Sequence, residues 1–141
     1  MDLELLFVVA NAAALAGWLP LFLGMRSRGG IGYARLVAVL LAVGYLILFL
    51  LYAGEARVLA GNYSLQGIGA FFSHPALQLL GWVHYLAFDL FVGSWEAEEA
   101  QRAQLPHLLV LPCLVLTFML GPIGFLAFML LRRCKGRRAA A

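Results

Sequence analysis

Three side chains that could do chemistry interrupt one apolar stretch of the sequence. Residues 81–95 read GWVHYLAFDLFVGSW and carry His84, Tyr85 and Asp89 within six positions. A charged Asp near the centre of a membrane helix costs about 2.5–3.5 kcal/mol on insertion scales. Either desolvation keeps the Asp89 carboxyl protonated, or the group faces a cation, a histidinium or a wet cavity. Because such residues are rare inside membranes, Asp89 and Tyr85 are candidates for binding a ligand or moving a proton.

Helical geometry divides these side chains between two faces. At about 100° per residue, Trp82, Tyr85 and Asp89 share one stripe, and His84 and Phe88 share another roughly 140° away. Tyr85 and Asp89 lie one turn apart and can hydrogen-bond, whereas His84 and Asp89 cannot pair within the helix. His84 and Asp89 therefore each need a partner on another helix. Such a contact either joins two helices or forms part of a functional site. The other candidates for this polar set are Asn11, Gln78, His107 and Thr117.

The histidines offer a weaker case for a cofactor. A haem between two histidines would use His84 and His107, since His74 falls in a linker. His84 lies roughly 14 Å below the start of its helix, whereas His107 begins the next one, so we do not expect them to pair. The sequence predicts no metal site, and it gives no identity for a cofactor. The candidates for contacts with a flat organic ligand are His84, Trp82, Phe88 and His107.

Composition places the chain in a membrane. Of 141 residues, 64% are hydrophobic and 12% are charged, against about 45–50% and about 25% in soluble domains. The excess must face lipid, so the lipid bilayer is the first expected partner. We expect a single domain over residues 1–131 and a basic tail over 132–141 that lies on anionic headgroups. No folded basic face with interleaved aromatics is present, which argues against nucleic-acid binding.

Four apolar windows are each long enough to cross a bilayer, for which about 20 residues are needed. They are Leu3–Leu23, Tyr33–Tyr52, Pro75–Trp95 and His107–Leu131. The charged stretch WEAEEAQRAQ, residues 95–104, is expected to end the third helix and to form a short helical segment or a loose loop. Pro112 and Gly121-Pro122 should kink the fourth helix. The predicted fold is all-α, an integral membrane four-helix bundle with a kinked fourth helix and both ends on one side. Lys and Arg divide six against four between the two sides, which does not fix the orientation.

Aromatic residues add a possible ligand surface. The chain has ten Phe, five Tyr and three Trp, which serve first as lipid-facing and interfacial side chains. The same rings suit a flat hydrophobic polyene or quinone. A kinked helix opposite an aromatic stripe with one carboxyl would offer such a ligand a slot, and a polar stop for a hydroxyl or epoxide oxygen.

The stretch GWVHYLAFDLFVGSW, followed by PHLLVLPCLVLTFMLGPIGFLAFMLLR, resembles the abscisic-acid-deficient-four-like family. These are small four-span membrane proteins, and the plant members are needed to form neoxanthin from violaxanthin. The resemblance is carried by His84, Tyr85, Asp89, Gly93, Pro112 and the turn Gly121-Pro122-x-Gly124. It implies a role in carotenoid metabolism, as the isomerising enzyme or as an accessory factor.

The chain departs from plant members of that family in two ways. We expect no transit peptide, because the first residues are not rich in Ser and Arg, and the chain carries the acidic segment Glu96-Ala97-Glu98-Glu99. These features favour a bacterial inner membrane, or a photosynthetic membrane, in which violaxanthin need not occur. The resemblance therefore implies the fold of this chain but does not identify its substrate.

Three functional hypotheses follow, and whether the protein is an enzyme stays open among them. The first is a protein that binds or isomerises a carotenoid or xanthophyll, with Asp89 as the acid and Tyr85 orienting the ligand. The second is a non-catalytic subunit of a larger photosynthetic or respiratory membrane complex, or a homo-oligomer, packed through the small residues of the first helix. The third, a haem or metal redox protein, has the weakest support.

Overall fold

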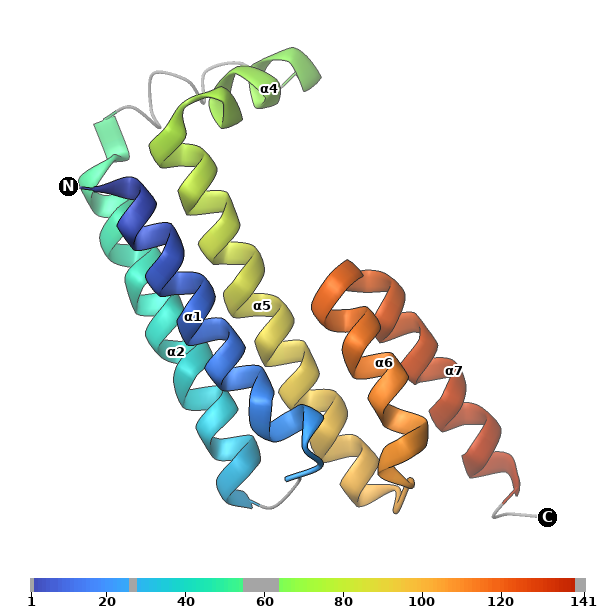
Figure 1. The fold of residues 1–141 in the computed structure, drawn as a ribbon. Coiled ribbons are helices and arrows are strands. Elements are labelled where there is room, and N and C mark those ends of the chain that lie inside the picture. The colour runs from blue at the N-terminus through green and yellow to red at the C-terminus, as the bar shows by residue number, and fades with distance from the viewer. Residues whose placement is uncertain (1, 26–27, 55–63, 139–141) are drawn as a thin grey trace.

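The described part of the chain is helical. The structure is a computed structural model that describes residues 2–25, 28–54 and 64–138. Within these ranges every regular element is an α-helix (Figure 1). The helices are α1 (Leu3–Phe22), α2 (Arg28–Leu51), α4 (Leu65–Ser73), α5 (Pro75–Arg102), α6 (His107–Leu120) and α7 (Pro122–Arg138). The all-α class predicted from the sequence is confirmed.

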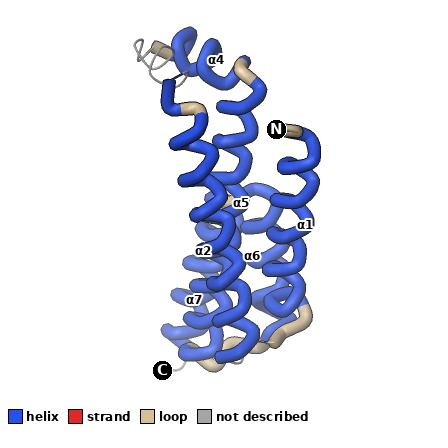
Figure 2. Tube along the Cα trace, turned by 90° about the vertical axis from the view of Figure 1, so that its left-hand side faces the viewer, coloured by secondary structure: helices blue, strands red, loops and turns tan. Residues whose placement is uncertain are grey.

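Helices α1, α2 and α5 form a core of three helices. They contain 20, 24 and 28 residues, and each is long and apolar enough to cross a membrane. The three helices run side by side, with α2 antiparallel to the other two (Figures 1 and 2). A helix of 20 residues is about 30 Å long, which matches the thickness of the hydrocarbon layer.

Small residues let these three helices approach closely. Ala10, Ala14 and Gly17 of α1 are buried. A Cβ atom built on Gly93 of α5 would lie 2.3 Å from the indole ring of Trp18. Lipid tails are as apolar as the helix surfaces, so no hydrophobic force drives membrane helices together. Their association depends on such close packing. The small-residue face of the first helix therefore packs inside this chain.

The fourth predicted span is wrong, because the chain turns back on itself at Gly121. Helix α6 has 14 residues, about 21 Å of helix, which is shorter than the hydrocarbon layer. Gly121 has φ +45°, a left-handed conformation that glycine adopts readily, and Pro122 supplies no backbone donor to continue α6. Helix α7 then packs back along α6. Pro112, by contrast, lies inside α6 without ending it.

This hairpin of α6 and α7 changes the topology. In the described part of the chain, three helices can span a membrane and a short hairpin packs against α5, which is not a four-helix bundle. The N-terminus of α1 and the end of α7 lie at opposite ends of the molecule (Figure 1). The prediction that both ends share one side is therefore wrong as well.

The third helix does not end at Trp95. Helix α5 continues to Arg102, because its charged residues find partners on neighbouring elements. Glu96 is fully buried. The ion pairs join Glu98 to Arg35 and Arg102, and Glu99 to Arg102 and Arg132. They connect α2, α5 and α7 at one end of the bundle.

Part of the linker between α2 and α5 forms a short helix, α4. Ser64 accepts a hydrogen bond from the backbone N–H of Gly67 and so caps α4. Helix α4 leaves Leu65, Ile68 and Phe72 exposed at the end of the molecule that carries the N-terminus (Figure 1). Apolar side chains at that position suit a membrane surface. Residues 55–63 of the linker and 139–141 of the predicted tail lie outside the described residues.

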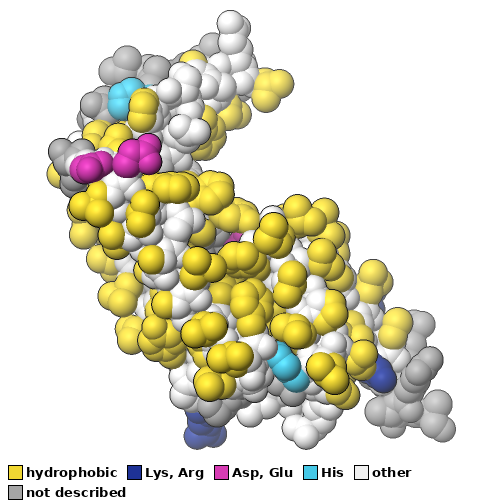
Figure 3. Space-filling view, viewed as in Figure 1, with side chains coloured by type: hydrophobic (Ala, Val, Ile, Leu, Met, Phe, Trp, Pro, Cys, Tyr) yellow, Lys and Arg dark blue, Asp and Glu magenta, His cyan; other side chains and the backbone are white. Residues whose placement is uncertain are grey.

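The corrected topology gives the molecule a strong charge asymmetry. Nine of the ten Lys and Arg residues belong to the end where α1 meets α2, α5 meets α6 and α7 finishes. The tenth, Arg57, belongs to the segment between α2 and α4. On the face drawn in Figure 3, the dark blue side chains lie towards that first end. Because Lys and Arg accumulate on the cytoplasmic side, we expect the α5–α6 connection and the end of α7 to be cytoplasmic.

Cys134 allows a direct test of this orientation. It is exposed near the end of α7, whereas Cys113 is buried. A membrane-impermeant maleimide should leave Cys134 unlabelled in intact cells and label it in inverted vesicles. A Gln66→Cys variant in a Cys134→Ser background should show the reverse pattern, since Gln66 lies in α4 at the opposite end. Labelling of Cys134 in intact cells would contradict the assignment.

Candidate functional site

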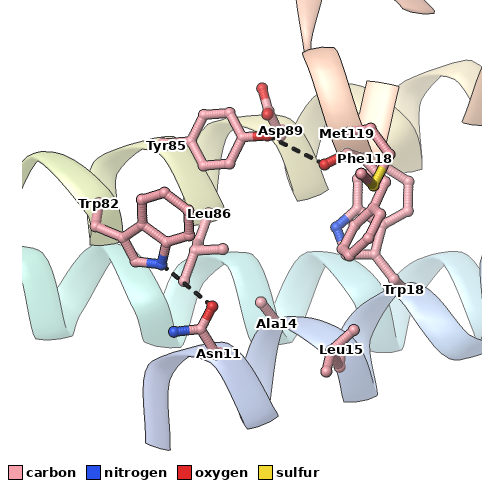
Figure 4. Close-up of a pocket in the computed structure, with 10 residues that line it drawn as sticks. All are labelled: Asn11, Ala14, Leu15, Trp18, Trp82, Tyr85, Leu86, Asp89, Phe118 and Met119. Carbon is pink, nitrogen blue, oxygen red and sulfur yellow. Dashed lines mark hydrogen bonds between the residues drawn. The ribbon is translucent and has the colours of Figure 1, made fainter. Parts of the chain in front are cut away.

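Asp89 lies in a pocket between α1, α5 and α6 (Figure 4). The pocket has a volume of about 240 Å³. Its polar side chains are Asn11, Trp82, Tyr85 and Asp89, and its apolar walls are Ala14, Leu15, Trp18, Leu86, Phe118 and Met119. Leu15 and Met119 are more than half exposed, so the pocket opens towards the surface that faces lipid.

Tyr85 is held in place by the end of α6. Its hydroxyl donates a hydrogen bond of 3.1 Å to the backbone carbonyl of Phe118 (Figure 4). Carbonyl groups in the last turn of a helix lack a partner within the helix, so this one is available as an acceptor. The same hydroxyl lies close enough to the Asp89 carboxyl, one turn further along α5, for the two groups to interact.

The Asp89 carboxyl is pressed against the hairpin turn. A Cβ atom built on Gly121 would lie 2.9 Å from Oδ1 and 3.2 Å from Oδ2. Helix α7 starts at the next residue, so the partially positive N-terminal end of this helix lies beside the carboxyl. The Oδ2 atom is buried and has no hydrogen-bond partner among the described residues. The wall of the pocket therefore contains a buried acidic oxygen that has no hydrogen-bond partner among the described residues.

Trp82 and Asn11 form the polar wall on the other side of the pocket. The indole Nε1–H of Trp82 donates to Oδ1 of Asn11 at 3.2 Å (Figure 4). Asn11 in turn donates from Nδ2 to the carbonyl of Phe7 at 2.7 Å. The Trp82 ring lies 5.7 Å from Phe7 and 5.5 Å from Tyr85 between centroids. These contacts fix the position of the Trp82 ring beside the carboxyl.

His84 and Phe88 lie on a different face of α5. Both are exposed, and their ring centroids are 4.6 Å apart. His84 also contacts Tyr45 of α2, at 5.6 Å between centroids. The structure thus separates these two predicted ligand-binding residues from Asp89, in agreement with the angle between the two stripes.

His107 connects α6 to α1. Its Nε2–H donates to the carbonyl of Phe22 at 2.9 Å, and its ring packs on Gly24. The residue therefore caps the end of α1 and lies away from both His84 and the pocket. Among the described residues, no group of three or more His, Cys, Asp and Glu side chains is placed to hold a metal ion.

A second buried carboxyl was not found from the sequence. The Thr117 hydroxyl lies 2.9 and 3.0 Å from the two carboxyl oxygens of Glu96, and both side chains are fully buried. Glu96 follows Asp89 by seven residues, so both carboxyls face the hairpin from one side of α5. This seven-residue spacing could have indicated that Glu96 shares the face of Asp89. The charges around Glu96 instead favoured the end of the helix, followed by a short helical segment or a loose loop.

The fold and this site define a class: a helical integral membrane protein with a carboxyl inside an aromatic-lined pocket that opens towards lipid. A family model described as ABA DEFICIENT 4-like matches residues 5–128, and the chain belongs to this family. The matched residues include all three long helices, α6 and the first part of α7. The resemblance found in the sequence is thereby confirmed. Neither a curated protein nor a solved structure matches the chain.

Proposed function

We propose that the protein binds one end ring of a carotenoid or xanthophyll in the Asp89 pocket, within the bilayer, and isomerises it. Family membership supports a role related to neoxanthin formation. The observation that carries the proposal is the buried Oδ2 of Asp89, which has no hydrogen-bond partner in the described part of the chain and belongs to a side chain that lines a mostly apolar pocket. A ring that bears a hydroxyl or an epoxide would supply the missing polar contact.

The size of the pocket supports a ring rather than a whole pigment. Pockets for drug-sized ligands measure about 300–1,000 Å³, and this one measures about 240 Å³. A single six-membered ring with its methyl groups fits such a space, and the polyene chain would leave it. Trp18, Trp82 and Phe118 present aromatic faces against which a flat ring can pack.

The chemistry needs one acid and no cofactor. In this proposal Asp89 gives its proton to the ring oxygen, and the carbon–oxygen bond of an epoxide opens. Loss of a proton from a neighbouring carbon to the Asp89 carboxylate restores the acid and completes an isomerisation. Tyr85, whose hydroxyl proton is donated to the Phe118 carbonyl, can accept a hydrogen bond from a hydroxyl on the ring and so orient the ring. General acid catalysis of this kind contributes about 10²–10⁴-fold in rate.

Absorption spectroscopy of the protein tests this function. The protein is purified in mild detergent, mixed with an epoxidised or hydroxylated carotenoid, and separated from free pigment by gel filtration. We expect retained pigment with a shifted absorption spectrum, and an isomerised product in the extract. Absence of retained pigment would contradict the proposal. Retained but unchanged pigment would contradict the isomerisation and favour an accessory, non-catalytic role.

A further inference from the structure

A second hollow adjoins the Asp89 pocket. Because the α6–α7 hairpin is short, it leaves the first turns of α5 uncovered below α4, and the outline of the molecule is indented beside them (Figure 3). This hollow has a volume of about 370 Å³, and its lining includes Glu4, Gln78 and Trp82. Trp82 also lines the Asp89 pocket. The two hollows therefore lie end to end along α1 and α5, with Trp82 between them, and we call the pair the long groove.

The long groove follows matched stripes on two parallel helices. On α5 the spacing of Gln78, Trp82, Tyr85 and Asp89 is i, i+4, i+7 and i+11, which is one face of a helix. On α1, Glu4, Phe7 and Asn11 follow the same rule with i, i+3 and i+7. The ring contact of Phe7 with Trp82 and the hydrogen bond of Trp82 to Asn11 hold the stripes in register.

The two ends of the long groove are polar and its middle is aromatic. Gln78 and Asp89 are separated by three helical turns, about 16 Å. Glu4 and Gln78 belong to the end of the molecule that carries the N-terminus, near the membrane surface. None of the described residues that line the groove is Lys or Arg. An anionic phosphate headgroup is therefore disfavoured, whereas a neutral hydroxyl can donate to Glu4 or to the Gln78 amide oxygen.

We propose that the ligand is a single-ring polyene with a hydroxyl at the far end of its chain, with the ring at Asp89 and the hydroxyl at Gln78 and Glu4. This inference rests on the proposed function and narrows its ligand to a shortened carotenoid that keeps one end ring. A carotenoid with a hydroxylated ring at each end spans a whole bilayer, about 30 Å of hydrocarbon. The distance between Asp89 and Gln78 is about half of that thickness. The spacing of the two polar ends of the long groove thus favours a molecule that is shorter than a carotenoid with two rings.

Binding of a chain-length series tests the proposal. Single-ring polyenes of increasing length, each with a terminal hydroxyl or a terminal methyl group, are titrated into the detergent-solubilised protein, and quenching of tryptophan fluorescence is followed. We expect affinity to peak at one intermediate length, where the hydroxyl form binds about fivefold to tenfold tighter than the methyl form, the gain of one hydrogen bond. A full-length carotenoid with two hydroxylated rings should bind more weakly than this optimum.

Two variants separate recognition from folding. Gln78→Leu should reduce the hydroxyl preference to less than about twofold, because it removes the hydrogen-bonding group while keeping an apolar wall. Gln101→Leu, the same change on α5 outside the groove, should keep the full preference. Affinity that rises steadily with length, or a preference unchanged in Gln78→Leu, would overturn this inference alone. Failure of every polyene to bind would overturn the proposed function instead.

Discussion

Replacement of Asp89 with Asn is expected to lower the rate of pigment isomerisation by about 10²–10⁴-fold, the usual contribution of a general acid. The amide has nearly the same volume as the carboxyl, so the contact with Gly121 survives. The amide cannot donate a proton to the epoxide oxygen or accept one from the neighbouring ring carbon. The rate of appearance of the isomer, measured by chromatography of pigment extracts, checks this expectation.

The matched control for this variant is Glu98→Gln. It makes the same carboxyl-to-amide change on the same helix, outside the pocket and in ion pairs with Arg35 and Arg102. We expect wild-type isomerisation from it, since surface ion pairs contribute little to stability. An Asp89→Asn protein that elutes as a single species, retains pigment and isomerises it at the wild-type rate would refute the role of Asp89 as the acid.

The arrangement of polar residues on α5 was predictable from the sequence, because it depends on helical geometry alone. Asp89 is on the face that Trp82 and Tyr85 share, and all three line the pocket. His84 and Phe88 face away from it. The angle between residues in a helix does not depend on the rest of the fold, so sequence reasoning separates these faces without knowing what packs on them.

The turn at Gly121 was not predictable in the same way. A run of 25 apolar residues is long enough to span a bilayer, and a Gly-Pro pair inside it is compatible with either a kink or a reversal. The reversal depends on the closeness of two helices, and only glycine at position 124 allows that closeness. The spacing of Gly121, Pro122 and Gly124 was noticed in the sequence, but its structural meaning depends on contacts with Thr117 and Asp89.

The acidic segment shows the limit of reasoning from local charge. Three glutamates within four residues are typical of a solvated loop, yet Glu96 is fully buried and Glu99 nearly so. Their partners come from distant parts of the chain, Thr117 for the first and Arg132 for the second. Since the hairpin brings those partners to α5, an error about the fourth helix also produces an error about the end of the third.

Substitution of Gly124 with Ala is expected to disrupt the hairpin and, with it, the pocket. A Cβ atom at this position would lie 2.0 Å from the backbone nitrogen of Thr117 and 2.3 Å from its Oγ1. Backbone cannot rotate away as a side chain can, so α6 and α7 must separate. Overpacking costs typically about 1–3 kcal/mol, and we expect the upper end of this range. The melting temperature in detergent, followed by circular dichroism, should fall accordingly.

The same separation should also abolish pigment retention, because Thr117 immediately precedes two residues of the pocket wall, Phe118 and Met119. The separation of α6 and α7 would also break the hydrogen bond from the Thr117 hydroxyl to Glu96. The buried Glu96 carboxyl would then lack its donor. Gly32→Ala is the matched control: a Cβ there meets nothing within 4 Å, and alanine favours a helix over glycine by up to about 1 kcal/mol. If Gly124→Ala melts at the same temperature as Gly32→Ala and retains pigment equally well, the tight α6–α7 contact does not hold the pocket, and the site must be sought on α1 and α5 alone.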